Sequence, residues 1–391
     1  MNLNLDKSAW KRVALGDVAK HVTDRVDAET SGLERFLAGE HIPSNDLAIT
    51  QWGVIGRDPI GPMFYKRFRP GHVLYVSRRS YLRKTAVPEF EGITGEKTFV
   101  LESRDESVLL QRFLPFVLSA EVFHSYAVAN SRGSVNPYIN WTELANYEFD
   151  LPPLDEQKRL ADLLWALERH RGALIEELRC ISIARDRMIE AGLPQEATMV
   201  PLSAAASIRS GITLGPARRD LPATAPYLRV ANVQRGSLDL SEMKEVGATE
   251  AEVSTKGVTR GDVLVVEGHA SVEEIGRAAI WDSGESPLFQ NHLFRVRAAE
   301  SFRPRYLLEW INSAAGRSYV RTVAKSTSGL NTINSTVLKA MPVPASPLSV
   351  QDALLEQLAV VDLSRRQVSD AESSLLRVRA TLADEIFGGA E

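Results

Sequence analysis

The chain has 391 residues, 44% of them hydrophobic and 25% charged, a composition typical of a globular protein with more than one domain. It has no apolar run long enough to span a membrane and only one cysteine, Cys180. These features exclude a membrane span, an intrachain disulfide and a multi-cysteine zinc site, and we expect a cytoplasmic protein. The net charge of −4 alone argues against a nucleic-acid partner, but basic residues are concentrated at 57–84 and 295–325.

Residues 1–150 are predicted to form a domain with mixed α and β structure. Short runs rich in β-branched and aromatic residues, such as "GHVLYVS" from Gly71 and "KTFVLE" from Lys97, predict strands. The apolar residues of "SVLLQRFLPFVLSAEVFHSYAV", from Ser107, have helical spacing. Because the strands do not alternate regularly with long helices, we favour an α+β fold over a doubly wound sheet.

Basic and aromatic residues gather in "YKRFRPGHVLYVSRRSYLRK", from Tyr65 to Lys84. Such a cluster contacts phosphates or guanine when it faces DNA, and is otherwise a solvated basic surface. The polar loop "SRGSVN" contains Gly133, which lets the backbone approach a ligand closely or only forms a strained turn. The candidate DNA-binding residues of this domain are Arg57, Lys66, Arg67, Arg69, Arg78, Arg79, Tyr81, Arg83, Lys84, Arg132 and Asn136.

Residues 151–195 are predicted to contain a long helix. From Asp155 to Ala191 there is no proline, and apolar residues recur every seven positions at Leu160, Leu167, Leu174, Ile181 and Met188. This strict period favours coiled-coil packing over the alternative, a long core helix of a globular domain.

The same order of segments recurs at a shift of about 194 residues. "INWTEL" at Ile139 matches "INSTVL" at Ile333, and the seven-residue period returns at Leu354, Val361, Val368, Leu375 and Leu382. Residues 196–346 are therefore predicted to be a second domain similar to the first, and residues 347–391 a second long helix. Duplication predicts an antiparallel coiled coil with a pseudo-twofold internal repeat, which would hold the two domains apart as a calliper does.

The second domain has its own candidate DNA contacts. "STSGLN", which contains Gly329, parallels the polar loop of the first domain, and "EGHASVEE" follows a predicted strand. The candidates, with the same alternative of a solvated surface, are Arg218, Arg219, Asn232, Arg235, His269, Lys325 and Asn331.

Motifs that would make this chain an enzyme are absent or imperfect. "NPYI" is similar to the Asn-Pro-Pro-aromatic loop of adenine methyltransferases, but Tyr138 stands where the second proline belongs. Asp150, Glu156 and Lys158 imitate a nuclease set, but Glu156 opens a helix, where the helix dipole alone favours an acid. With no P-loop and only scattered histidines, we expect no catalytic residue, metal ligand or cofactor in this chain.

The duplicated signature resembles the specificity (S) subunits of type I DNA restriction–modification systems. It consists of the glycine-containing loop before "INWTEL" and a short strand leading into "LPPLDEQKRLADLLWALE". The second copy, "VPASPLSVQDALLEQLAVVD", keeps Gln351 but has Val350 in place of Glu156.

This resemblance implies that each domain is a target recognition domain reading half of a split site in double-stranded DNA. The helices would be a conserved spacer that sets the distance between the halves and docks two methyltransferase subunits. It implies S-adenosylmethionine on those partners, and ATP on a restriction/translocase subunit where one joins. Two alternatives stay open: a coiled-coil scaffold that does not bind DNA, and the DNA-recognition subunit of another defence system.

Overall fold

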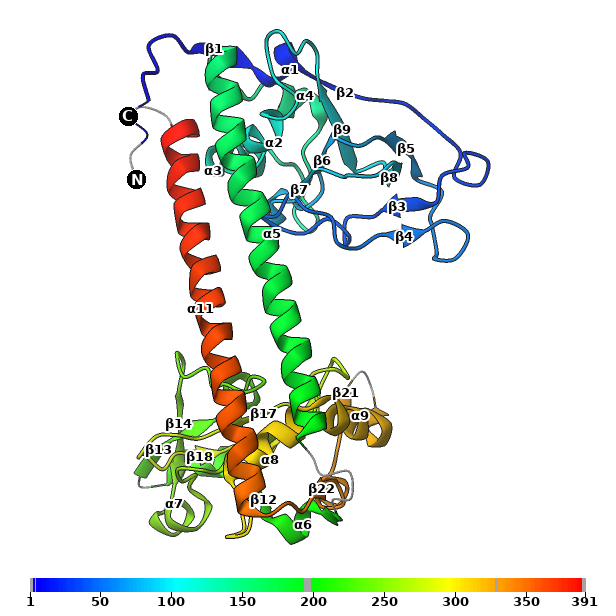
Figure 1. Cartoon of the computed structure of the whole chain (residues 1–391). Helices are drawn as coiled ribbons and strands as arrows, with labels where there is room; N and C mark the ends of the chain where they lie inside the picture. Colours follow the sequence, from blue (N-terminus) through cyan, green and yellow to red (C-terminus); the bar gives the residue numbers. More distant parts are fainter. Residues whose placement is uncertain (1–2, 4, 193–197, 222, 328–329, 389–391) are drawn as a thin grey trace. The chain divides into compact units, whose positions relative to one another are not determined.

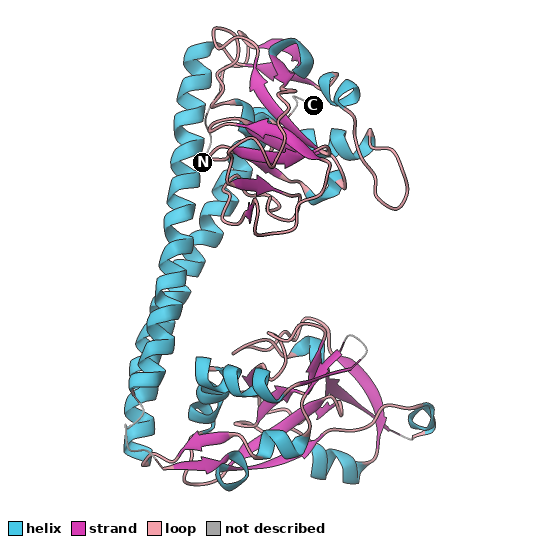
Figure 2. Ribbon diagram, turned by 90° about the vertical axis from the view of Figure 1, so that its right-hand side faces the viewer, coloured by secondary structure: helices cyan, strands magenta, loops and turns pink. Residues whose placement is uncertain are grey.

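The structure, a computed structural model, describes residues 3, 5–192, 198–221, 223–327 and 330–388. The chain divides into two compact units, the first made of Met1–Glu177 and Val368–Glu391 and the second of Leu178–Gln367. Two long helices, α5 (Leu154–Ala191) and α11 (Leu348–Phe387), each contribute residues to both units (Figure 1). Each unit also contains sheets and short helices (Figure 2), as the predicted α+β class requires.

The first unit is built on an antiparallel sheet with the order β2-β9-β6-β7. Its strands are β2 (Ala19–His21), β9 (Thr98–Ser103), β6 (Val73–Val76) and β7 (Thr85–Ala86). A mixed sheet with the order β4-β3-β8-β5 lies in the same unit. Its strands are β4 (Gly53–Val54), β3 (Arg35–Leu37), β8 (Gly92–Gly95) and β5 (Phe64–Phe68). A separate pair joins β1 (Lys11–Ala14) to β10 (Glu148–Leu151).

Short helices cover the core of the first unit, in which Tyr75, Phe113 and Phe123 are fully buried. They are α1 (Leu15–Val18), the 3₁₀ turn η1 (Ser80–Leu82), α2 (Leu114–Val117), α3 (Glu121–Ala129) and α4 (Trp141–Ala145). The segment from Ser107 therefore holds two short helices rather than one, because the backbone is extended at Ala120.

The second unit repeats this plan. Its main antiparallel sheet contains β12 (Ala206–Ser210), β19 (Leu293–Ala298), β15 (Val263–Val266) and β17 (Ala278–Ile280). A mixed sheet contains β14 (Lys244–Ala248), β13 (Ala223–Leu228) and β18 (Leu288–Phe289), and β11 (Met199–Pro201) pairs with β22 (Pro342–Pro344). The helical segments are α6 (Leu202–Ala205), η2 (Pro216–Asp220), η3 (Val230–Asn232), α7 (Glu250–Lys256), α8 (Pro304–Asn312), α9 (Ala314–Val323) and α10 (Ser335–Lys339).

The apolar residues from Pro304 to Ala324 have the spacing of one continuous helix, but this stretch also forms two helices. Ser313 is extended, and its hydroxyl accepts a hydrogen bond of 3.1 Å from the Gly316 amide, which caps α9. A Cβ at Gly316 would lie 2.3 Å from the Trp310 carbonyl oxygen, so the sharp turn requires glycine.

The two long helices pack antiparallel within each unit (Figure 1). In the first unit Glu168 of α5 pairs with Arg379 of α11 at 2.8 Å. Arg171, later on α5, pairs with Glu372, which is earlier on α11, at 3.5 Å. The two helices therefore run in opposite directions. In the second unit Arg185 of α5 pairs with Asp362 of α11 at 2.8 Å. All ten heptad residues predicted from the sequence are buried or half-buried, which confirms the apolar seam.

A buried glutamine joins each long helix to its unit. The Gln157 side chain accepts from the Leu110 amide at 2.9 Å and donates to the Val108 and Pro152 carbonyls at 2.8 Å. Because both residues 108 and 110 belong to the loop that follows the central sheet, Gln157 fixes where that loop meets the first turn of α5.

Gln351 makes the equivalent bonds in the second unit. It accepts from the Arg303 amide at 2.7 Å and donates to the Ser301 and Ser346 carbonyls at 2.9 and 2.8 Å. Both glutamines are 0% exposed. The repeated glutamine in the two helix signatures is therefore a structural clamp.

Replacing Gln157 by Ala should destabilise the first unit. It leaves the buried Pro152 carbonyl and the partly buried Leu110 amide and Val108 carbonyl without this partner, and a buried group left unpaired costs about 1–3 kcal/mol. We expect a loss of about 2 kcal/mol or more in the free energy of unfolding, measured by denaturant titration. The Gln351→Ala variant should lose a similar amount, and the control Gln51→Ala, at an exposed position, almost nothing. Equal stability of all three variants would contradict the clamp.

Candidate nucleic-acid interface

In the first unit, the loop after β6 pairs with the segment after α3. Arg78 and Arg132 both form β-bridges to Tyr138, and the Ile139 amide donates to the Ser77 carbonyl at 3.1 Å. We call residues 77–79 and 132–139 the first ribbon. Arg78, Arg79 and Arg132 are exposed on it, so the ribbon presents a basic surface.

The second unit contains the same arrangement at the equivalent place. Here β16 (Gly268–His269) pairs with β21 (Leu330–Thr332), which pairs with β20 (Lys325–Thr327). The Ile333 amide donates to the Glu267 carbonyl at 2.9 Å, as Ile139 does to Ser77. We call residues 267–269, 325–327 and 330–333 the second ribbon.

The register of the ribbons corrects the correspondence drawn from the sequence. The bridge of Arg78 to Tyr138 corresponds to the pairing of Gly268 with Thr332. Asn331 is therefore equivalent to Pro137 and not to Asn136. Gly133 has a φ of 94°, as the predicted turn requires, whereas Gly329 lies outside the residues that the structure describes.

The loop that carries the arginines of the first ribbon is held in an unusual conformation. Arg79 and Arg83 have φ values of 55° and 54°, in the left-handed region that residues other than glycine seldom occupy. Its contacts hold it there: the Ser80 and Ser131 hydroxyl oxygens lie 2.6 Å apart, and Arg83 pairs with Glu121 at 2.6 Å. Strain of this kind persists only where the surroundings impose it, and it is common at functional sites.

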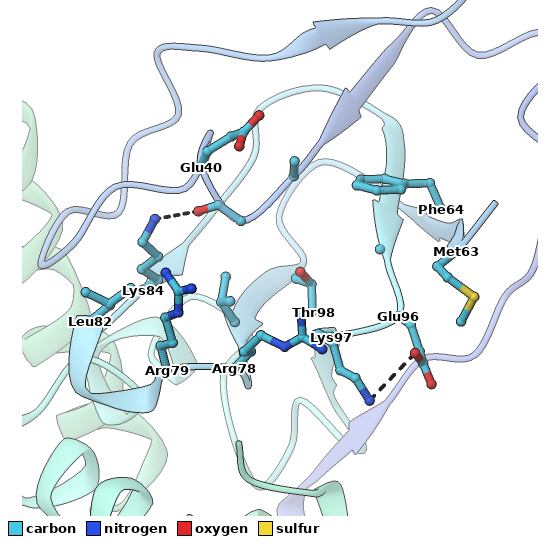
Figure 3. Close-up of a pocket in the computed structure, with 14 residues that line it drawn as sticks. Glu40, Met63, Phe64, Arg78, Arg79, Leu82, Lys84, Glu96, Lys97 and Thr98 are labelled. Atoms are coloured by element: carbon cyan, nitrogen blue, oxygen red, sulfur yellow. Dashed lines mark hydrogen bonds and ion pairs between the residues drawn. The ribbon is translucent and has the colours of Figure 1, made fainter. Parts of the chain in front are cut away.

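A cavity of about 490 Å³ lies beside this loop in the first unit (Figure 3). Arg79, Leu82 and Lys84 stand on one side of it and Met63, Phe64 and Glu96 on the other. The Lys84 ammonium donates to the Gly39 carbonyl at 2.5 Å, and burial lowers the pKa of Lys84. Four basic side chains line the cavity against two acids, so it favours an anion: Arg78, Arg79, Lys84 and Lys97 against Glu40 and Glu96.

A smaller cavity of about 280 Å³ has aromatic walls that include Phe99, Tyr138 and Trp141. His21 and Lys66 lie at this cavity, with the Lys66 ammonium 3.4 Å from His21 Nε2. Burial, followed by the charge of Lys66, lowers the pKa of His21 to about 4, and burial lowers the pKa of Lys66 to about 8. The imidazole is therefore neutral at pH 7.

Several predicted DNA contacts are engaged inside the protein instead. Lys66 is 6% exposed and donates to the Glu96 and Thr98 carbonyls at 2.7 and 3.0 Å. Asn232 is 3% exposed and donates to the Asp239 and Glu242 carbonyls at 2.8 and 3.0 Å. Because their donors already have partners, we exclude both residues from the proposed DNA contacts.

The other predicted contacts divide into paired and open side chains. Those that pair with an acid or a backbone carbonyl are Arg57 with Asp58, Arg67 with Glu91, Arg69 with Asp24, Arg83 with Glu121, Lys84 with Gly39, Arg132 with Glu143, Arg218 with Glu252 and Arg235 with Glu273. Tyr81, Arg219 and Lys325 are exposed, and His269 and Asn331 are half-buried on the second ribbon. Only some of the DNA contacts predicted from the sequence therefore lie on the two ribbons.

Lys97 is a basic residue of this surface that the sequence analysis did not single out. It lies between β8 and β9, lines both cavities, and its ammonium lies 5.4 Å from the ring centre of Tyr138. The Ser77 amide donates to the Lys97 carbonyl at 2.8 Å. In the second unit the Glu267 amide donates to the His292 carbonyl at 3.0 Å in the same way. Lys97 precedes β9 as His292 precedes the equivalent strand β19, and this correspondence in the sequence could have identified Lys97.

No triad of His, Cys, Asp or Glu that could hold a metal ion occurs among the described residues. Within the same residues, no helix has the length and apolarity that a membrane span needs. Two acids of the set that imitates a nuclease motif are engaged in ion pairs. Glu156 pairs with Arg159 at 2.6 Å, and Asp150 with Arg12 at 3.4 Å.

Two histidines of the first unit, the buried His124 and the half-buried His21, should make its stability depend on pH. Burial is the main cause that lowers the pKa of His124 to about 4, with smaller effects of Arg83 and Arg379, and His21 is lowered to the same value. Unfolded histidine titrates near 6.5, so acid protonates the unfolded chain first. The free energy of unfolding should therefore fall as the pH drops from about 6.5 to about 4.

Denaturant titrations at several pH values test this expectation. His124→Leu should reduce the loss of stability between pH 6.5 and 4, whereas the control His170→Leu, at an exposed position on α5, should leave it unchanged. The same pH dependence in both variants would exclude His124 as a source.

The chain is similar in sequence to known proteins. Residues 61–179 match the type I restriction modification DNA specificity domain. The chain is similar to the type I restriction enzyme EcoKI specificity subunit of Escherichia coli strain K12, with 22% identity over 311 residues that cover 73% of this chain and 67% of that one. It is also similar to the StySPI specificity subunit of Salmonella potsdam, with 26% identity over 168 residues that cover 41% and 36%.

The fold is shared with solved structures over nearly the whole chain. A chain from a type I R-M system, solved to explain complex assembly and conformational transition, gives a TM-score of 0.59 at 18% identity over 97% of this chain and 98% of that one. The S subunit of a type I system from M. genitalium gives 0.53 at 12% identity over 100% and 98%. The matched domain, the named relatives and the shared fold all make this chain similar to type I restriction–modification specificity subunits.

Proposed function

We propose that this chain is the DNA-specificity subunit of a type I restriction–modification complex, in which each domain reads one half of a two-part DNA site. The two ribbons carry this proposal. They are built by the same backbone hydrogen bonds but expose different side chains at equivalent positions. A protein that reads two different short sequences needs a repeated frame with a varied surface, because base identity is read by side chains at base edges.

In this proposal residues 1–150 and 196–346 are the two target recognition domains, and residues 151–195 and 347–391 are the spacer that docks two methyltransferase subunits. The long helices expose apolar side chains that a partner could cover, namely Ile175, Ile183, Val360 and Leu363. Exposed apolar groups along a helix suit a protein–protein interface. A restriction/translocase subunit would join through the same assembly.

The chain itself would perform no catalysis. The carboxylates of the nuclease-like set are engaged in ion pairs with Arg159 and Arg12, which supports a structural role for Glu156 and Asp150. S-adenosylmethionine and ATP would belong to the partner subunits, and the complex would act on DNA in the cytoplasm.

The proposed DNA contacts are the open polar side chains on and beside the ribbons. In the first domain they are Arg78, Arg79, Tyr81 and Asn136, joined by Lys97 at the cavity rim, and in the second they are His269, Lys325 and Asn331. Arg132 lies on the first ribbon but pairs with Glu143, and Arg219 is exposed on η2, so both are weaker candidates. The paired arginines near these positions would need to exchange an internal partner for DNA, which makes them weaker candidates.

Removing the open arginines of the first ribbon should weaken DNA binding and its dependence on salt. Each phosphate contact contributes about 0.9 to the slope of log affinity against log salt concentration. The variant Arg78→Ala/Arg79→Ala should therefore lower that slope by about 1 to 2 in a titration of the complex with duplex DNA. Arg260→Ala, an exposed arginine paired with Asp282 in the second unit, is the control and should leave the slope unchanged.

The decisive experiment is to sequence methylated DNA from cells that express the chain with its co-purifying partners. We expect methyladenine within a motif of two short halves separated by unspecified bases. Replacing residues 1–150 with the corresponding domain of a relative should change one half of that motif only. Changes in both halves would contradict the assignment of one domain to one half-site, and co-purification with a nuclease but no methyltransferase would indicate another defence system.

A further inference from the structure

Arg79 and His269 occupy the same position on the two ribbons. Each follows a residue that pairs with the other arm, Arg78 with Tyr138 and Gly268 with Thr332. Arg79 is exposed and His269 half-buried. The backbone therefore brings an arginine and a histidine to one equivalent point of the two domains.

The Arg79 side chain is oriented by its neighbours. Its Nε donates to Asn136 Oδ1 at 2.7 Å, and its backbone amide donates to the Pro137 carbonyl at 2.5 Å. Within the described part of the chain, nothing accepts a hydrogen bond from its two Nη groups. They present donors alone, and a fork of donors matches the two acceptors O6 and N7 of guanine in the major groove.

His269 and Asn331 present a different pattern. His269 Nδ1 accepts from the Ser271 amide at 3.1 Å, so the ring proton is on Nε2, which is a donor. Asn331 Nδ2 donates to the Ala270 carbonyl at 2.8 Å, which leaves its Oδ1 as an acceptor.

The two side chains are also neighbours on one face. His269 and Asn331 are directly opposite in the antiparallel pair, where Cβ atoms lie about 4.5–5.5 Å apart. One donor beside one acceptor matches N7 and the N6 amino group of adenine.

We propose that Arg79 and His269 are equivalent base-reading residues, Arg79 selecting a guanine in one half-site and His269 with Asn331 selecting an adenine in the other. This inference rests on the proposed function and adds to it the base chemistry of one position in each half. The two halves would differ because the same backbone frame offers donors alone in one domain and a donor with an acceptor in the other.

The test uses the complex of the full chain with its co-purifying partners. Bound duplexes are selected from a random DNA library and sequenced, for the wild type and for Arg79→Gln and His269→Arg. Glutamine pairs with adenine and arginine with guanine, so each variant should exchange the preferred base at one position. Residue 79 has a positive φ, which strains Gln as much as Arg, so the Arg79→Gln substitution changes the side chain without adding backbone strain.

For Arg79→Gln we expect guanine to give way to adenine at one position of one half-site, with the original preference lowered about tenfold or more. For His269→Arg we expect adenine to give way to guanine in the other half. Controls are Arg12→Gln and Arg260→Gln, exposed arginines outside the ribbons that pair with acids, and both should reproduce the wild-type motif.

The outcomes separate this inference from the proposed function. A two-part motif that Arg79→Gln leaves unchanged, with binding retained, would overturn the inference alone. So would a change in the same half by both variants, because the two residues belong to different domains. A wild-type complex that selects no motif would overturn the proposed function as well. Thermal unfolding of each variant would distinguish lost reading from lost folding.

Discussion

The buried glutamine at the start of each long helix is the constraint on which the rest of the structure depends. A recognition surface is useful only if it is held at a fixed place on the helix that carries it. Gln157 and Gln351 provide this attachment through three hydrogen bonds each, in a fully buried setting where an unmade bond is costly. They also explain why the chain repeats a motif 194 residues apart: each copy solves the same problem of attaching a domain to a helix.

The two halves of the chain are more alike in their backbone framework than in their surface side chains. Paired bonds persist between the halves, including the amide of Leu15 to the Tyr147 carbonyl and that of Leu202 to the Met341 carbonyl, both at 2.8 Å. Side chains that point outward from the ribbons have not persisted, since Arg78 is matched by Gly268 and Tyr138 by Thr332. Backbone bonds do not depend on side-chain identity, so the surface was free to change while the frame remained.

The sequence predicts those parts of the structure that local patterns determine. The strands β6, β9 and β15 and both long helices follow from apolar runs and a seven-residue period. The break at Ser313 depends on a cap and on the close approach of Gly316 to a carbonyl, which no apolar pattern reveals. Lys66 was predicted to contact DNA because it lies in a basic stretch of the sequence. It is buried because its ammonium bonds the carbonyls of Glu96 and Thr98, which are 30 and 32 positions away and which no local pattern connects to it. Lys97 was missed because its place beside the ribbon depends on how β8 and β9 turn.

The two hairpin arms of the ribbons differ in length. Arg132 pairs with Tyr138, six positions on, whereas Lys325 pairs with Thr332, seven positions on. In a paired strand a shift of one residue turns every side chain to the opposite face. Arg132 and Lys325 nevertheless lie opposite the equivalent residues Tyr138 and Thr332, so the extra residue is taken up between the paired arms. A residue gained or lost inside an arm would instead exchange the groups that the arm offers to a ligand while leaving the core intact. Under the proposed function, a change of spacing in an arm would alter the DNA target as directly as a change of amino acid.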